Sequence, residues 1–231
     1  MRDLPHVGLY RRATAAAFVL APTLFLADNL LHPKELARGN EAGQLAHTAD
    51  AYTRWQLAHA LGFCAIVVFA AAVLGLAFLV RRREPGLGLL GGALAVAGLI
   101  GLGAVITIDG FTWGVLGEVS TKGPAAHAGA VIALHDVQHS NWSFLYYLTP
   151  LGFIVGMVLL AVGAVRQGAI PTWAGGLLIL AVLLTGTETT IVSNAYFIVG
   201  AAVLLAGGAA TALAIARMSD EQFAAGGGAG S

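Results

Sequence analysis

The chain has 231 residues, of which 58% are hydrophobic and only 10% are charged, and its formal net charge is zero. A soluble domain carries about 25% charged residues, so this composition argues against one and indicates a polytopic membrane protein whose main partner is the lipid bilayer. The neutral charge balance gives no reason to expect a nucleic acid as a partner, and the single cysteine, Cys64, excludes an internal disulfide.

Six apolar stretches approach the length of about 20 residues that a transmembrane helix needs. In chain order they cover residues 14–31, 55–80, 86–108, 143–165, 172–187 and 195–216, and the fifth is short. We therefore expect an all-α fold with one six-span membrane domain over residues 1–217. The remaining residues, 218–231, end in GGGAGS and are expected to form a flexible tail.

Basic residues mark alternate ends of the predicted spans, and eight of the 12 Lys and Arg side chains fall on the side of the two termini. These eight are Arg2, Arg11, Arg12, Arg81, Arg82, Arg83, Arg166 and Arg217. The positive-inside rule then places both termini in the cytoplasm, with the spans in the plasma membrane. A signal-peptide cut after Ala27 would put Phe25 where a small residue is required, so the first span is expected to stay as an anchor.

Glycine is abundant, with 31 residues, and in membrane helices it favours close helix packing. Two GxxxG pairs, Gly88 with Gly92 and Gly152 with Gly156, predict contact faces for a homo-oligomer or for another subunit of a membrane complex. The run GLGLLG at residues 86–91 matches the dinucleotide-binding fingerprint, but that motif requires a preceding strand. Here the run opens a predicted membrane helix, so we assign it to packing.

Ionisable side chains gather at the outer ends of the predicted spans, and six of the seven histidines lie on that side. Asp28 and His32 close the first span, and His59 lies about one turn into the second. Asp109 ends the third span, and Glu188 ends the fifth. An ionisable residue within a membrane span indicates a functional site, because burying it without a partner is costly.

The segment of residues 125–139 contains three histidines, His127, His135 and His139. Residues four positions apart share a helix face, so His135 and His139 should stack if this segment is helical. We expect a short interfacial helix on the extracytoplasmic side that covers the outer ends of the spans as a lid. The polar groups below it would be His59, Asp28, Asp109 and Glu188.

Imidazole and carboxylate groups at one site suit Zn, Cu or Fe, and histidines on separate spans could also bind a haem iron. The predicted ligands are His59, His135 and His139, with His32 as a further candidate. The leading hypothesis is a metal- or haem-dependent enzyme with an extracytoplasmic site. The competing interpretations are a water-facing surface for His135 and His139 and a buried core position for His59.

Carboxylates and aromatic residues complete this hypothetical active site. The candidate catalytic residues are Asp109, Glu188 and Asp28, as further ligands or as an acid–base pair. Aromatic residues near the outer interface form either an interfacial belt or the lining of a pocket for a lipid-like or quinone-like substrate. The residues assigned to such a pocket are Trp113, Trp142 and Tyr146.

Two other functions fit the same sequence. In the first, Asp109 and Glu188 perform metal-independent acid–base chemistry on a lipid or isoprenoid, as in a cyclase or an isomerase. In the second, the protein is a transporter, a sensor or an assembly subunit and has no catalytic activity. The sequence contains no CxxC, no HExxH and no phosphate-binding loop that would decide between them.

Overall fold

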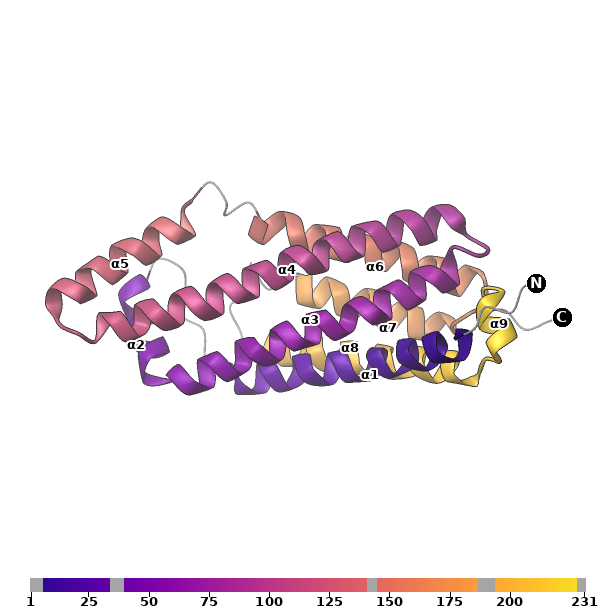
Figure 1. Ribbon diagram of the computed structural model, residues 1–231, viewed down its shortest axis with the longest axis horizontal. Coiled ribbons are helices and arrows are strands. Elements are labelled where there is room, and N and C mark those ends of the chain that lie inside the picture. Colours follow the sequence, from indigo (N-terminus) through magenta and orange to yellow (C-terminus); the bar gives the residue numbers. More distant parts are fainter. Residues whose placement is uncertain (1–5, 34–39, 141–144, 187–193, 228–231) are drawn as a thin grey trace.

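The computed structural model describes residues 6–33, 40–140, 145–186 and 194–227, and every regular element in these ranges is a helix, which confirms the predicted all-α class. Three of the helices are peripheral: α2 (Glu41–Asp50), α5 (Pro124–Gln138) and α9 (Asp220–Ala224). The helices of the main bundle, called the long helices although the described part of α7 is no longer than α5, are α1 (Val7–Leu31), α3 (Tyr52–Val80), α4 (Pro85–Ser120), α6 (Leu145–Arg166), α7 (Thr172–Gly186) and α8 (Asn194–Arg217) (Figure 1).

The six long helices form a closed ring. Each packs against the next long helix of the chain, and α8 returns to pack against α1. Aromatic rings fill the centre, where Phe69 meets Phe18 and Phe153 edge to face at centroid distances of 6.1 and 5.7 Å. Met157 is completely buried beside them. Short turns place α3 beside α4 and α6 beside α7, whereas the connections from α1 to α3 and from α4 to α6 are longer and contain α2 and α5.

Five of the long helices have the length and apolar composition needed to cross a membrane, namely α1, α3, α4, α6 and α8. The 15 described residues of α7 span about 22 Å, which is less than the roughly 30 Å of a bilayer core. Large apolar side chains face outward from the ring, and those of Leu90 and Ile100 are 57% and 70% exposed. The molecule is therefore a helical bundle of membrane-protein character.

The helix of the third predicted span is longer than the span itself, because α4 does not stop at Ile108 but continues to Ser120. The helix has 36 residues and a length of about 54 Å, so its outer third extends beyond the thickness of a bilayer core. The predicted span ends at Ile108 because the charged residue Asp109 interrupts the apolar sequence there. Backbone hydrogen bonding does not require apolar side chains, so the helix continues past it.

Glycines explain why the outer part of α4 still packs closely. Gly110, Gly114 and Gly117 share one face and are all buried. Gly114 lies against Gln56 of α3, and a Cβ atom at Gly117 would lie 3.2 Å from the backbone nitrogen of Ala49 in α2. A larger side chain at Gly110 or Gly117 would push the helices apart, whereas one at Gly114 would first displace the amide of Gln56.

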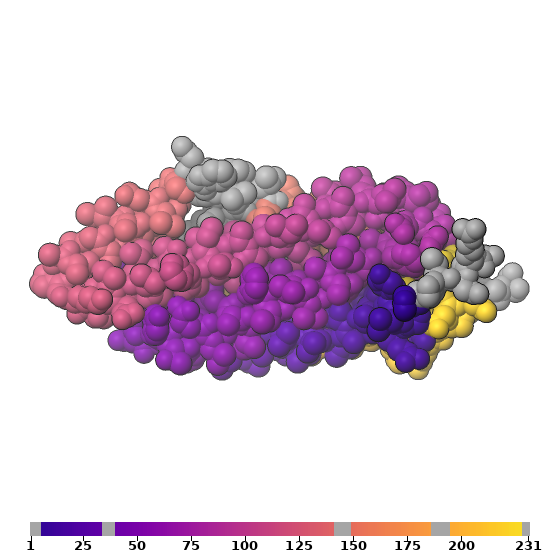
Figure 2. All heavy atoms as spheres, in the orientation of Figure 1, coloured from indigo at the N-terminus to yellow at the C-terminus, as the bar shows by residue number. Residues whose placement is uncertain are grey.

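An arm extends from the ring at the end away from the termini, and it consists of α2, α5 and residues 109–120 of α4 (Figures 1 and 2). The helix predicted over residues 125–139 is present as α5. It packs against α4 and α2 rather than across the ends of the spans, so the predicted lid is wrong. A small core of Leu45, Ala130 and Leu134 joins the three helices.

The end that holds the termini is also packed. Ser219 caps α9 in a capping box with Gln222, and Arg11 of α1 forms an ion pair of 2.8 Å with Asp220. Phe223 is fully buried and stacks on Phe78 of α3 at 5.8 Å. Part of the segment expected to be a flexible tail therefore docks on the ring, because it has a helix cap and an apolar anchor.

Both GxxxG pairs face other helices of the same chain. Gly152 and Gly156, one turn apart on α6, both face α4. A Cβ atom at Gly156 would overlap the backbone of Ala95 in α4. A Cβ atom at Gly92 would come within 2.7 Å of the Cβ atom of Ala77 in α3. These glycines therefore contribute to contacts within the ring.

The variant Gly156→Leu should destabilise the bundle by at least about 2 kcal/mol, because the new side chain must separate α6 from α4. The matched control is Gly176→Leu, since no atom lies within 4 Å of a Cβ atom at Gly176. Thermal unfolding of both purified variants in detergent measures the difference. Equal stability of the two variants would contradict the packing described here.

Candidate metal centre

A helix cap at Asn40 and a turn at Gly123 position α2 and α5 next to each other in the arm. The Asn40 side chain accepts a hydrogen bond of 3.2 Å from the backbone N–H of Gly43 and caps α2, which puts Glu41 in the first turn. Gly123 has a φ of 130°, a conformation that favours glycine, and it reverses the chain before Pro124 opens α5. The reversal returns α5 along the arm towards α2.

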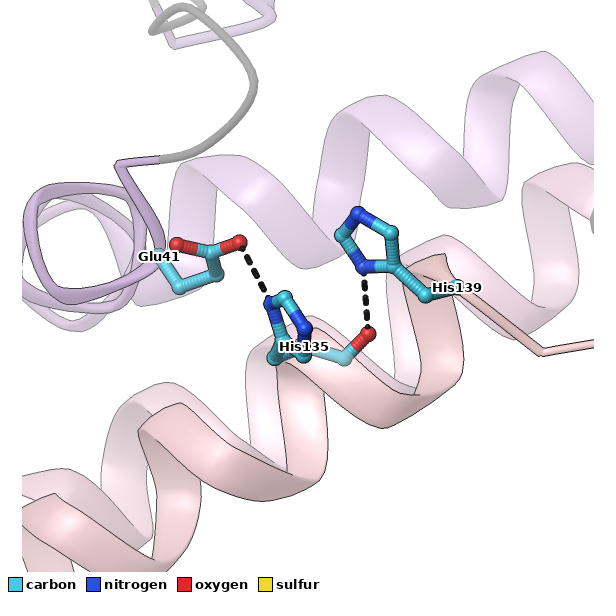
Figure 3. A group of neighbouring side chains, drawn as sticks. All are labelled: Glu41, His135 and His139. Carbon is cyan, nitrogen blue, oxygen red and sulfur yellow. Dashed lines mark hydrogen bonds and ion pairs between the residues drawn. The ribbon is translucent and has the colours of Figure 1, made fainter.

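Three side chains on these helices form a group with the spacing of a metal site (Figure 3). One ligand atom from each of Glu41, His135 and His139 lies within 4.8 Å of the others. The Nδ1 atom of His135 is 3.3 Å from Oε1 of Glu41, and the two imidazole rings stack with centroids 4.0 Å apart. We call this group the triad.

The hydrogen bonds of the triad determine the tautomer of His139 and favour the ionised form of Glu41. His139 donates from Nδ1 to the carbonyl oxygen of His135 at 2.9 Å, and a carbonyl can only accept. The neutral ring therefore keeps its lone pair on Nε2, where a metal binds. A hydrogen bond from its own backbone N–H, and then the bond from His135, lower the pKa of the Glu41 carboxyl below its ordinary value of 4.5.

A second polar contact lies one turn further along both helices. Gln138 donates from Nε2 to Oε1 of Gln44 at 3.1 Å, three residues beyond His135 and Glu41 respectively. Gln44 is buried, next to the small core of the arm. The two polar contacts together define the register of α2 against α5, and so they bring the carboxylate to the imidazoles.

The other histidines predicted as ligands lie elsewhere, in a cluster of four rings that we call the indole–imidazole cluster. Its members are His32, Trp55, His59 and Trp113. The ring of Trp55 lies 4.4 Å from that of His59, 4.9 Å from that of His32 and 5.5 Å from that of Trp113. The structure thus places His32 and His59 together but does not bring His59 to His135 and His139.

Backbone contacts hold this cluster in place between α3 and α4. Gly110 leaves room for the His59 ring, and its carbonyl oxygen accepts a 3.2 Å hydrogen bond from Nε1 of Trp55. His59 donates from Nδ1 to the carbonyl of Trp55 at 2.9 Å, so the lone pair of the neutral ring is on Nε2. Among the described residues, the buried Nε1 of Trp113 has no hydrogen-bond partner.

His32 follows the last residue of α1, and burial lowers its pKa below the ordinary value of 6.5. A hydrogen bond with the carbonyl of Pro33 opposes this effect, and Coulombic interaction with Arg54 and His47 adds to it. The His32 ring is therefore neutral at pH 7. The Nε2 atom of His47 is buried and makes no hydrogen bond among the described residues.

The predicted catalytic carboxylates do not join the triad. Asp28 is 8% exposed and lies against Gly62 of α3, whereas Asp109 precedes Gly110 on α4. Trp113, assigned to the predicted substrate pocket, belongs to the indole–imidazole cluster. The other predicted site residues fall outside the described positions or side chains: Glu188, Trp142 and Tyr146.

Glu41 is not among the site residues predicted from the sequence, because no helix is predicted between the first span, which ends at residue 31, and the second, which begins at residue 55. A signal was available, since Asn40 is a good helix cap and residues 41–50 contain neither proline nor a β-branched run. The contact between α2 and α5 cannot be predicted from a local sequence pattern, because Glu41 and His135 are 94 residues apart in the chain.

Comparison of the chain with protein-family models, with curated proteins and with solved structures finds no match in any of the three. The assignment of a function therefore rests on the geometry described above.

The variant His139→Ala should weaken Zn²⁺ or Co²⁺ binding at least about 100-fold, because it removes one of three ligands. His127→Ala is the matched control, since His127 lies on the same helix but outside the triad. Titration calorimetry on both variants gives the affinities. Equal affinities would show that the triad is not the site.

The variants Gln138→Leu and Gln44→Leu should each weaken Co²⁺ binding about tenfold, although neither removes a ligand. Each removes the hydrogen bond between the two amides and loosens the register of α2 against α5. The double variant should cost no more than the worse single variant, since both act on one contact. Strictly additive losses in Co²⁺ titrations would contradict this coupling.

Proposed function

We propose that the protein is a metal-dependent membrane enzyme whose ion is bound by Glu41, His135 and His139. The observation that carries this proposal is the position of two imidazoles and one ionised carboxylate within 4.8 Å of one another. The same donor set holds catalytic zinc in many hydrolases and iron in non-haem oxygenases. The His135 side chain is 55% exposed, so solvent and substrate can reach the remaining coordination positions.

A single ion fits the triad better than haem. The rings of His135 and His139 stack 4.0 Å apart on one helix, and no macrocycle fits between two rings at that spacing. Tetrahedral zinc ligands lie about 3.4 Å apart, so small side-chain rotations close the triad around an ion. The bound ion would act as a Lewis acid and supply an activated water at neutral pH.

The distribution of charge supports an extracytoplasmic position for the triad. Arg11, which pairs with Asp220, and Arg81 and Arg82, which pack over Phe78, are at the end of the ring that holds the termini. The arm is at the opposite end (Figure 1). With the basic end in the cytoplasm of a plasma membrane, the triad faces the outside.

The substrate that we propose is lipid-like or quinone-like, with a polar group that reaches the arm. What supports this class is the continuity of α4, which runs from the membrane segment into the arm without a break. A substrate anchored in the bilayer by an apolar chain would be delivered along that helix. Hydrolysis of its polar group by a water bound at an open position of the metal is the chemistry that such a site would supply.

Chelation should abolish turnover of an amphipathic ester such as para-nitrophenyl octanoate, and Zn²⁺ should restore it. His139→Ala should reduce the rate by at least about 100-fold, because an activated water is worth several kcal/mol to the barrier. His127→Ala should retain the wild-type rate. Elemental analysis must then find zinc in proportion to activity, and metal-free protein with full activity would contradict the proposal.

A further inference from the structure

Two arginine side chains lie over the same aromatic side chain at the end of the molecule that holds the termini (Figure 1). The Cζ atoms of Arg82 and Arg81 are 4.7 and 5.0 Å from the centre of the Phe78 ring, a distance at which an aromatic ring attracts a cation. Phe223 of α9 stacks on Phe78 at 5.8 Å and supports it from the other side of the contact. Packing therefore holds the two guanidinium groups close to each other.

These two positive charges have no counter-ion on the described residues. Arg81 and Arg82 are both exposed, and neither forms an ion pair within the part of the chain that the structure describes. Glu84, the acid of the same turn, lies 3.3 Å from Arg166 instead. Like charges that are held together repel each other, so an anion that contacts both would stabilise this arrangement.

The position of the pair along α3 places it at the surface of a bilayer. Arg81 directly follows Val80, the last residue of α3, and α3 is a candidate membrane span. Lipid phosphates lie in the head-group layer, which adds roughly 5–7 Å to each side of the hydrocarbon core. An arginine at the end of a span keeps its stem along the apolar surface and its guanidinium in this layer.

An outward-facing apolar side chain lies one turn deeper in the membrane. Leu74 is four residues before Phe78 on the same face of α3, and its side chain is 58% exposed. The surface of α3 thus passes from an apolar residue, through an aromatic one, to two cations within about two turns. A phospholipid has the same order of acyl chain, glycerol and phosphate.

We propose that Arg81 and Arg82 bind the phosphodiester of an anionic phospholipid, with one of its acyl chains on Leu74. A guanidinium offers parallel N–H donors that match the oxygens of a phosphate. Phosphatidylcholine carries the same phosphate, but its quaternary ammonium group cancels the charge, so it should bind more weakly than phosphatidylglycerol. This binding site requires neither the triad nor a metal ion.

The test is native mass spectrometry of the full chain in detergent, titrated with phosphatidylglycerol or with phosphatidylcholine of identical acyl chains. One phosphatidylglycerol per chain should bind at least about tenfold more tightly than phosphatidylcholine. Inorganic phosphate, titrated by calorimetry, should show no saturable binding at millimolar concentration, because it has no acyl chain. This comparison distinguishes a lipid head group from a soluble anion.

The double variant Arg81→Gln/Arg82→Gln should lose at least about tenfold in phosphatidylglycerol affinity and bind both lipids alike. The matched control is Arg12→Gln/Arg217→Gln, which removes two exposed arginines from the same end of the molecule and should change the affinity less than about twofold. Arg81→Lys/Arg82→Lys keeps the charge but loses the paired donors, so it should weaken binding about threefold.

Four results would overturn the proposal. The first is equal affinity of the wild type for the two lipids, and the second is an equal loss in the control variant. The third is a lysine variant that binds like the wild type, since charge alone would then be enough. The fourth is inorganic phosphate that binds as tightly as the lipid. The lysine variant decides the question even where the glutamine variant does not fold.

Discussion

Close approach of helices to the glycine faces of α4 is the contact on which the rest of the molecule depends. Within a bilayer there is little hydrophobic force between helices, so they associate through tight packing. A Cβ atom at Gly98 would overlap the backbone of Phe153 in α6, and one at Gly92 would press on Ala77 in α3. Further out, Gly117 admits α2. One helix thus organises the ring and supports the arm.

The structure separates the histidines into two environments with different chemistry. The triad lies on the arm, where His135 is more than half exposed and an ion can exchange with solvent. The indole–imidazole cluster is more deeply buried, with Trp55 only 5% exposed, and burial lowers the pKa of His32. In each case a carbonyl accepts from Nδ1, of His139 or of His59, so both sites present Nε2.

The sequence predicts the helical class and most of the span positions, because apolar length is a local property. It also predicts that His135 and His139 stack, since a four-residue spacing fixes this on any helix. It does not show that α4 passes through Asp109 or that Glu41 meets His135. Both depend on contacts between distant segments, through the glycines of α4 and the register that Gln44 and Gln138 define. His59 was predicted to join His135 and His139 only because all three lie on the same side of the membrane in the predicted topology. Membrane side alone does not determine which of these residues come into contact.

X-ray absorption spectroscopy of the zinc-loaded protein is the most direct test of the central claim, because it reports the ligands of the ion itself. With the triad as the site, the spectrum should show nitrogen and oxygen neighbours at about 2.0–2.2 Å together with the outer-shell scattering of two imidazole rings. Glu41→Gln should change the inner shell while both imidazole signals persist. A spectrum with oxygen neighbours alone, or one with a sulfur neighbour from Cys64, would contradict the account.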